Sequence, residues 1–218
     1  MAKRKKITAT DILSLYMNYI LEHRSRPKSV YTFAKDNNFD EAIFYEFYAS
    51  FEKLEQNIFT TFFDNTITAL QKSEEYATFD SRNKLLSFYY TFFENLTANR
   101  SYVKFALKNH KNRFRTLSVL TSLRKIFRHY IEQLEIETLD LKQDKIEKFQ
   151  QKTINEAAWI QFLVTIKFWL QDTSESFVKT DIFIEKSINT SFDVINIKPL
   201  KSVIDFGKFL FKEKMHTN

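Results

Sequence analysis

The sequence predicts an all-α protein, and its composition and periodicity both support this class. The 218 residues include one glycine, Gly207, and two prolines, whereas a sheet protein of this length needs many turn residues. Hydrophobic residues make up 44% and charged residues 28%, which is enough for both a core and a solvated surface. Apolar residues also recur at helical spacing along most of the chain. We therefore expect a bundle of helices.

Three short helices are predicted in the first fifty residues, over 11–23, 30–37 and 41–47. Each is preceded by a residue that favours the N-cap position, because its side-chain oxygen can accept from free backbone amides. These residues are Thr10, Ser29 and Asp40. The paired asparagines at 37–38 predict the turn between the second and third helices.

Longer helices are predicted after residue 49, where Ala49-Ser50 opens a fourth helix. Later helices are expected over 85–96, 102–107, 117–134, 154–170, 180–195 and 199–214. Thr180 is a candidate N-cap, and Pro199 suits a first helical turn. The polar stretch 135–152 has few apolar residues, so we expect a loop there.

The expected division is a small head over residues 1–49 and a larger helical body over residues 50–218. The body ends in an additional amphipathic helix. The connection is a helix that begins at the boundary, which predicts a rigid joint. We find no internal repeat and no low-complexity linker.

Cysteine is absent, which excludes disulfides, thiol catalysis and cysteine-ligated metals. The basic start Lys3-Arg4-Lys5-Lys6 is not followed by an uninterrupted apolar run, so no signal peptide is expected. No window reaches the eighteen apolar residues needed to span a bilayer. We therefore expect a cytoplasmic protein.

Catalytic constellations are missing from the sequence. The four histidines lie far apart and lack the spacing of a helix-borne zinc site: His23, His110, His129 and His216. One glycine cannot make a glycine-rich phosphate loop. We expect neither enzymatic activity nor a cofactor or metal.

The three short helices followed by a long one match the plan of a helix-turn-helix DNA-binding segment. Residues 29–54 resemble the signature of the TetR family of transcriptional regulators. The matching positions are Val30, Phe33, Ala34, Phe39, Asp40, Tyr45, Tyr48, Ser50, Glu52 and Leu54. The resemblance implies a TetR-like fold in which this head binds double-stranded DNA, with Tyr45 at the family's phosphate-contacting tyrosine.

The resemblance implies a DNA-binding set in the arm and the second and third helices: Lys5, Lys6, Lys28, Ser29, Tyr31, Asp40, Glu41, Ile43 and Tyr45. Arg26 and Lys35 are further candidates for phosphate contacts. In the groove, Ile43 and Tyr45 would meet bases, and Glu41 could accept from a cytosine amino group.

Three departures from the family pattern leave the role of the head open. Asn38 replaces the usual turn glycine, and Phe51 replaces a lysine that commonly meets phosphate. The third helix carries Glu41 and Glu46 after Asp40 and has no basic residue. Because phosphate contacts dominate affinity for DNA, a head kept only as a structural unit is the alternative.

The resemblance also implies a homodimer and a small apolar effector. Family dimers form through the last two helices of the core body, here 154–170 and 180–195, and would read a palindromic operator. The candidate effector-binding residues are Phe88, Phe92, Phe105, Phe127, His129, Trp159, Phe162 and Ile166, with Tyr89 and Gln161 as further polar groups. The alternative for each apolar residue is that it simply fills the core.

Two features fit a different function. Nine basic residues and no acidic one occur between Asn95 and Ile131, and the segment after Pro199 is amphipathic. The alternative to a regulator is therefore a protein of the same fold that does not bind DNA and binds a lipid or apolar ligand, at a membrane surface. Balancing acids on neighbouring helices are the simpler explanation of the basic stretch, and a terminal helix that packs on the body is the simpler explanation of the amphipathic segment.

Overall fold

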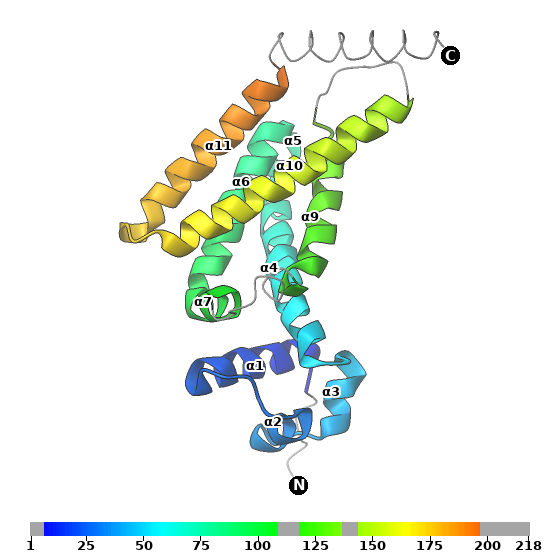
Figure 1. The fold of residues 1–218 in the computed structure, drawn as a ribbon, viewed down its shortest axis with the longest axis vertical. Coiled ribbons are helices and arrows are strands. Elements are labelled where there is room, and N and C mark those ends of the chain that lie inside the picture. Colours follow the sequence, from blue (N-terminus) through cyan, green and yellow to red (C-terminus); the bar gives the residue numbers. More distant parts are fainter. Residues whose placement is uncertain (1–6, 109–117, 137–143, 197–218) are drawn as a thin grey trace, which may run out of the picture. The chain divides into compact units, whose positions relative to one another are not determined.

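The computed structural model describes residues 7–108, 118–136 and 144–196, and in these ranges the chain is helical with no strand (Figure 1). The helices are α1 (Ala9–His23), α2 (Val30–Asp36), α3 (Glu41–Phe47), α4 (Phe51–Gln71), α5 (Glu74–Thr78), α6 (Ser81–Ala98), α7 (Arg100–Lys108), α9 (Thr121–Gln133), α10 (Asp144–Gln171), the 3₁₀ turn η1 (Glu175–Phe177) and α11 (Val178–Asn196). The expected all-α class is confirmed.

The chain forms two compact units. Unit 1 is drawn from Met1–Ala69 and Thr91–Phe127, and unit 2 from Leu70–Tyr90 and Arg128–Asn218. Helices α6 and α9 each contribute to both units, so the contacts do not divide the chain at a single point in the sequence. The head and body division at residue 49 remains a prediction.

Helix α1 begins two residues earlier than predicted, because Thr8 rather than Thr10 is its N-cap. The Thr8 hydroxyl accepts from the amide of Asp11 at 3.2 Å, and the Asp11 carboxylate accepts from the amide of Thr8 at 2.9 Å. This reciprocal capping box satisfies two backbone amides. The helix ends at Arg24, which adopts the left-handed conformation with φ 51°.

The caps of α2 and α3 are the predicted ones. Ser29 accepts from the amide of Thr32 at 3.1 Å, and Asp40 accepts from the amide of Ala42 at 2.8 Å. Between the helices Asn38 has φ 58°, a conformation that asparagine tolerates better than most residues. Residues 7–48, here called the head segment, therefore have the predicted three-helix form.

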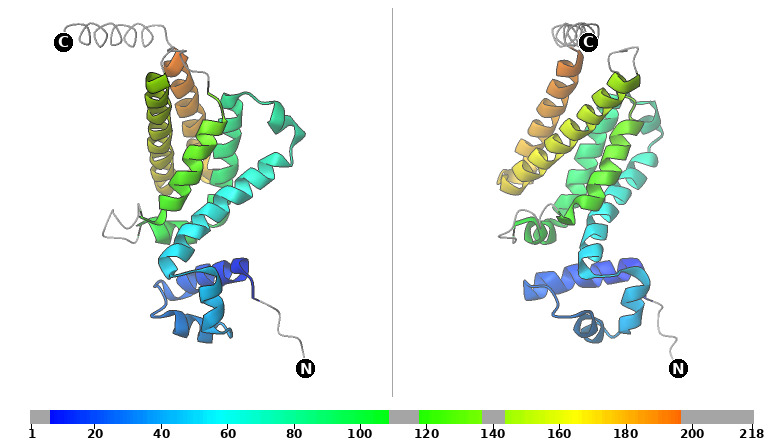
Figure 2. Two further views of the ribbon diagram at one scale, coloured as in Figure 1. Left: turned by 90° about the vertical axis from the view of Figure 1, so that its right-hand side faces the viewer. Right: turned by 45° about the vertical axis from the view of Figure 1, so that its right-hand side comes forward.

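Unit 2 is built around α10 and α11, which lie side by side (Figure 2). The prediction of a loop over 135–152 is wrong for 144–152, because α10 begins at Asp144. The remainder of the predicted loop includes 137–143, which lies outside the described residues.

Thr180 is not the N-cap of α11, because it is buried inside the helix. Its amide and hydroxyl both donate to Oδ2 of Asp172, at 2.9 and 2.7 Å. The other oxygen of Asp172 accepts from the amide and hydroxyl of Ser174, at 2.8 and 2.7 Å. Asp172 thus ties the end of α10 to the start of α11, across two residues with left-handed backbone, Ser176 and Phe177.

None of the helices in the described ranges is long and apolar enough to cross a membrane. The predicted helix over 199–214 lies outside those ranges.

Candidate nucleic-acid interface

Helix α3 is anchored by one residue and presents most of the others to solvent. Phe44 is fully buried, where it contacts Phe33 and Tyr48. On the outside, Tyr45 is 54% exposed, Glu46 is exposed and Ile43 is half-buried. A single aromatic anchor therefore fixes the helix while its outer face stays available for a partner.

The other predicted contact residues are also accessible. Tyr31 on α2 is 58% exposed, and Lys28 and Lys35 are exposed. Ser29 and Asp40 are exposed as well, but their side chains already cap helices. Lys5 and Lys6 lie outside the described residues. Helix α2 thus has the exposed cations Lys28 and Lys35 at its two ends, with the exposed acid Asp36 beside Lys35, whereas α3 carries the exposed acid Glu46 and no cation.

Arg26 does not have the free guanidinium that a phosphate contact needs. Its Nε donates to Oε1 of Glu55 at 2.6 Å, and its Nη2 donates to Oε2 of the same carboxylate. Its Nη1 donates to Oε1 of Glu52 at 2.8 Å. The bidentate pair with Glu55 occupies the geometry that would otherwise bind a phosphate, so the expected phosphate role of Arg26 is not supported.

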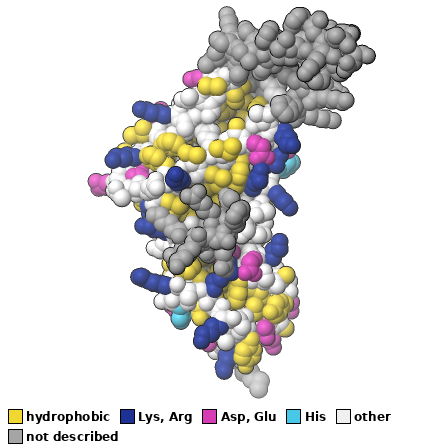
Figure 3. Space-filling view, in the orientation of Figure 1, with side chains coloured by type: hydrophobic (Ala, Val, Ile, Leu, Met, Phe, Trp, Pro, Cys, Tyr) yellow, Lys and Arg dark blue, Asp and Glu magenta, His cyan; other side chains and the backbone are white. Residues whose placement is uncertain are grey.

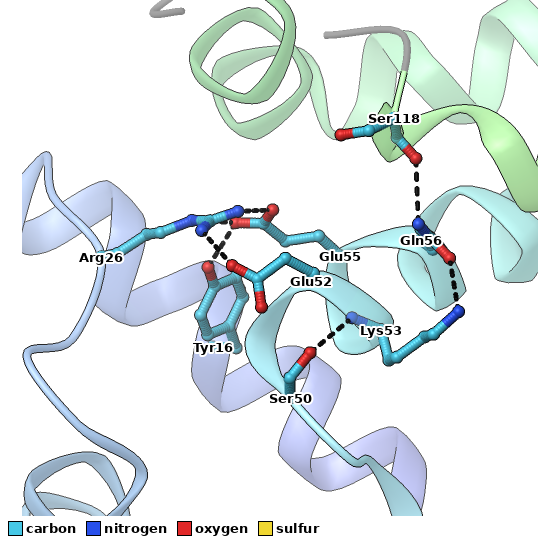
Figure 4. A network of polar contacts seen from close by, with 8 residues as sticks. All are labelled: Tyr16, Arg26, Ser50, Glu52, Lys53, Glu55, Gln56 and Ser118. Atoms are coloured by element: carbon cyan, nitrogen blue, oxygen red, sulfur yellow. Dashed lines mark hydrogen bonds and ion pairs between the residues drawn. The ribbon is translucent and has the colours of Figure 1, made fainter. Parts of the chain in front are cut away.

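Glu55 is the centre of a buried network that connects α1, the α1–α2 connection and α4 (Figure 4). Glu55 is only 5% exposed, and its carboxylate accepts a 2.6 Å hydrogen bond from the Tyr16 hydroxyl. Burial first, and then the charge of Glu55, raise the pKa of Tyr16. Burial lowers the pKa of Arg26, but the hydrogen bonds and the electrostatic attraction to Glu55 outweigh burial and raise this pKa overall. Tyr16 thus remains a donor and Arg26 a cation at physiological pH.

Sequence reasoning missed this network. Glu52 and Glu55 occupy one helical face at i and i+3, which is a common surface pattern. Nothing in the sequence pairs position 55 with positions 16 and 26, since those contacts depend on how α1 packs on α4.

The Phe51 departure has a packing explanation. Its ring stacks on Tyr16 with centroids 5.3 Å apart, and it contacts Phe33 and Phe44 edge-on at 5.8 and 5.3 Å. The position that commonly carries a phosphate-binding lysine in the family therefore belongs to the aromatic core of the head segment.

The predicted effector residues are mostly buried, and they divide between the two units. In unit 2, the Phe162 ring lies 5.6 Å from Trp159 and 6.4 Å from Phe88, and Ile166 is buried on the same helix as Phe162. In unit 1, Phe92 and Phe127 are fully buried and Phe105 is half-buried. The predicted effector-binding aromatic residues that lie in unit 2 thus form one cluster.

The polar residues suggested for the effector site have other surroundings. The His129 side chain is exposed and contacts Gln133 and Glu132. The Gln161 side chain donates to Ser187 and accepts from Ser191, both on α11. His129 therefore lies on the surface of α9, away from a buried pocket. Tyr89 is fully buried beside Phe162.

An open apolar groove of about 560 Å³ runs along α10 and α11. Its lining residues are Phe168, Lys179, Ile182, Phe183, Lys186, Ser187 and Thr190. The rings of Phe168 and Phe183 stack with centroids 4.5 Å apart and join the two helices. Further exposed apolar side chains on the same two helices are Ile160 and Val164 on α10, and Val178 and Val194 on α11. Hydrophobic side chains gather over these helices in Figure 3.

The basic stretch is partly balanced where it is described. Arg128 Nη1 lies 3.2 Å from Oε1 of Glu156 on α10. Lys104 and Lys125 are exposed. The side chains at 108–117 are outside the described residues. In the described part of the chain, no three His, Asp or Glu side chains gather as a metal site would require.

Comparison with known proteins agrees with this architecture. A family model described as "Tetracyclin repressor-like, C-terminal domain" matches residues 84–210, which is more than half of the chain. The chain therefore belongs to the tetracycline repressor-like family of regulators. No curated protein matches the chain.

Proposed function

We propose that this protein is a dimeric DNA-binding transcriptional regulator, with repression as its mode and a small apolar molecule as its effector. The observation that carries the proposal is the presentation of α3. It is anchored through Phe44 and exposes Tyr45, in a chain whose C-terminal part belongs to a family of regulators. The head segment would then act as a helix-turn-helix unit with α3 in the major groove.

Phosphate contacts come from the side of α2 in this proposal. Lys28, Lys35 and Tyr31 are exposed there and would hold the backbone. Base contacts come from α3, where Ala42 and Ile43 suit thymine methyl groups and Glu41 suits a cytosine amino group. Since few cations face the DNA, affinity should depend on these base contacts more than in a strongly basic head, and its decrease with salt should be shallow.

Dimerisation is assigned to the groove and the exposed apolar residues of α10 and α11. Ile160 is 60% exposed, and Val164 and Ile182 are also exposed. A second copy would cover them in a two-fold arrangement, as most homodimers do. Lys179 and Lys186 border the groove and would stay at the rim, where charges remain hydrated.

The effector is assigned to the aromatic cluster of unit 2, around Trp159, Phe162 and Phe88. The aromatic residues of this cluster predict an apolar, ring-containing ligand held by few polar groups. Such a ligand would act by binding one arrangement of the regulator more tightly than the other.

Selection from a randomised duplex library, at low and at moderate salt, tests DNA binding. We expect enrichment of a palindrome, which Tyr45→Ala should abolish. Leu21→Ala, which alters another exposed residue of the head segment, should retain it. Failure to enrich any sequence at low salt, where phosphate contacts are strongest, would reject the proposal.

A second candidate function is favoured by the charge of α3. With Asp40, Glu41 and Glu46 and no cation on this helix, a head that does not bind DNA is the alternative, on a body that carries a lipid or apolar ligand. Flotation with anionic vesicles separates the two functions. Recovery of the full chain with the vesicles, together with failed DNA selection, would support the second.

A further inference from the structure

The outer face of α3 presents hydrogen-bond acceptors and almost no donors. Between residues 40 and 48 the sequence has no lysine, arginine, histidine, asparagine, glutamine, serine or threonine. Glu46 is exposed and Glu41 is half-buried, and an ionised carboxylate accepts hydrogen bonds but donates none. The Tyr45 hydroxyl is the only side-chain donor of α3, and the family resemblance places it at a phosphate. The other side chains of this helix can accept from DNA bases but cannot donate to them.

The rest of that face is apolar. Phe47 is 40% exposed at the end of the helix, Ala42 is exposed and Ile43 is half-buried. Phe44 is the one buried residue of α3, so the packing of the head segment does not use these three side chains fully. Apolar side chains of this kind contact the C5-methyl group of thymine, which is the apolar group that the major groove displays. The helix thus offers two kinds of contact, to donors and to methyl groups.

The four bases differ in whether they can use these contacts. In the major groove cytosine shows an amino donor and thymine shows a methyl group, whereas guanine shows two acceptors, N7 and O6. Adenine shows an amino donor beside the acceptor N7. The usual partners of purines are arginine or lysine for guanine and asparagine or glutamine for adenine, because these side chains donate to N7. Since α3 has none of them, its carboxylates and apolar groups match pyrimidines, and a carboxylate that faces N7 or O6 is repelled.

We propose that α3 reads the pyrimidine strand of each half-site. Glu41 and Glu46 accept from cytosine amino groups, the apolar side chains of α3 contact thymine methyl groups, and no side chain of the helix hydrogen-bonds to purine N7 or to guanine O6. This inference rests on the proposed function, which supplies the DNA, and it names the class of operator: a palindrome with a run of cytosine and thymine on one strand of each half-site.

Base analogues in the selected operator test this reading with the full-length wild-type protein. Replacing the half-site purines by 7-deaza purines exchanges N7 for a C–H group, and we expect Kd to stay within about twofold because nothing on α3 donates to N7. Replacing a contacted thymine by deoxyuridine removes only the methyl group, and we expect Kd to rise roughly fourfold for each methyl lost. The same replacements outside the half-sites are the control and should leave Kd unchanged. Fluorescence anisotropy measures each Kd.

Glu41→Gln tests the carboxylate itself. The new amide can both donate and accept, which suits the N7 and amino group of adenine, so selection with this variant should replace one cytosine of the half-site by adenine. Binding of the variant should then become sensitive to 7-deazaadenine at that base pair, by roughly tenfold in Kd. Glu22→Gln is the matched control, because it makes the same change at an exposed position of α1 and should select the wild-type operator. An unchanged operator for Glu41→Gln would overturn the role of Glu41.

The inference and the proposed function fail in different ways. An enriched palindrome whose binding is weakened about tenfold or more by 7-deaza purines, or is unaffected by deoxyuridine, would overturn the pyrimidine reading and retain the regulator. Failure to enrich any palindrome would reject both. The analogue measurements use the wild-type protein, so they decide the inference even if the Glu41 variant does not fold.

Discussion

Phe51 stacks on Tyr16 with ring centroids 5.3 Å apart and an interplanar angle of 27°. The same tyrosine donates from its other end to Glu55, so one side chain joins the aromatic core of the head segment to the buried ion pair. This explains why position 51 is aromatic in this chain. A lysine there would leave a gap among Tyr16, Phe33 and Phe44.

Restoring the family's lysine should therefore harm the protein. We expect Phe51→Lys to reduce the free energy of unfolding by about 2–4 kcal/mol, through lost aromatic packing and the poor hydration of a partly buried ammonium group. Urea denaturation followed by circular dichroism measures the loss. Lys53→Ala, an exposed change on the same turn, should cost less than about 0.5 kcal/mol. A Phe51→Lys variant as stable as the wild type would contradict the packing explanation.

Tyr45 should contribute to DNA affinity without contributing to stability. Its side chain is more than half exposed, so Tyr45→Phe removes only a hydroxyl that reaches solvent. If that hydroxyl donates to a phosphate, the loss should be about 1.5–3 kcal/mol, or roughly ten- to a hundredfold in Kd.

Fluorescence anisotropy with the selected operator measures this loss, and thermal unfolding should show an unchanged Tm. Tyr19→Phe supplies a matched control, because that ring stacks on His23 of α1 and lies outside the proposed interface. A Tyr45 variant that binds as tightly as the wild type would remove Tyr45 from the phosphate contacts.

Dimerisation should depend on the groove along α10 and α11. We expect Ile182→Glu to convert the dimer to a monomer, because the proposed interface would have to bury an unpaired carboxylate from each copy. Size exclusion with light scattering at micromolar concentration reads this directly. Asn65→Glu places the same charge on an exposed position of α4 and should leave the dimer intact. A wild type that is already monomeric would refute the assignment of the groove.

Asp172 should stabilise the protein at neutral pH and lose that effect in acid. Burial alone would raise its pKa, but hydrogen bonds from the side chains and amides of Ser174 and Thr180 outweigh burial and lower it to about 2. Because the folded pKa is below the ordinary value of 3.8, the contribution is complete above about pH 4 and falls as pH drops toward 2.

Asp172→Asn should therefore cost on the order of 1–2 kcal/mol at pH 7 and little near pH 2. Urea midpoints across this range measure the difference. Asp193→Asn is the comparison, since that carboxylate is exposed and pairs with Arg82 at the surface. A cost for Asp172→Asn that does not change with pH would show that its charge is not what holds the turn.

The parts of the fold that follow from local chemistry were predictable. Ser29 and Asp40 are the caps that the sequence indicated, and Asn38 has the left-handed backbone expected of a glycine substitute. The two N-caps that were predicted wrongly, Thr10 and Thr180, lie where another residue makes the better hydrogen bonds. Thr8 forms a capping box with Asp11 that Thr10 cannot form, and Asp172 takes the donors of Thr180.

The candidate site was predictable in type but less so in detail. Exposure of Tyr31 and Tyr45 follows from helical spacing around the buried Phe33 and Phe44. The commitment of Arg26 to Glu55 does not, because it joins residues 29 positions apart whose proximity depends on how α1 crosses α4. Long-range pairing of this kind leaves no periodic signal in one sequence.

The clasp that Asp172 makes with Ser174 and Thr180 has a consequence for assembly. It fixes the angle between α10 and α11 within a single chain, even though Ser176 and Phe177 hold backbone conformations that disfavour non-glycine residues. The surface that a second copy would bind is therefore already ordered in the single chain, and association requires little further ordering of either partner. The heat-capacity change of association should then reflect the apolar area that is buried, without the larger contribution that accompanies coupled folding.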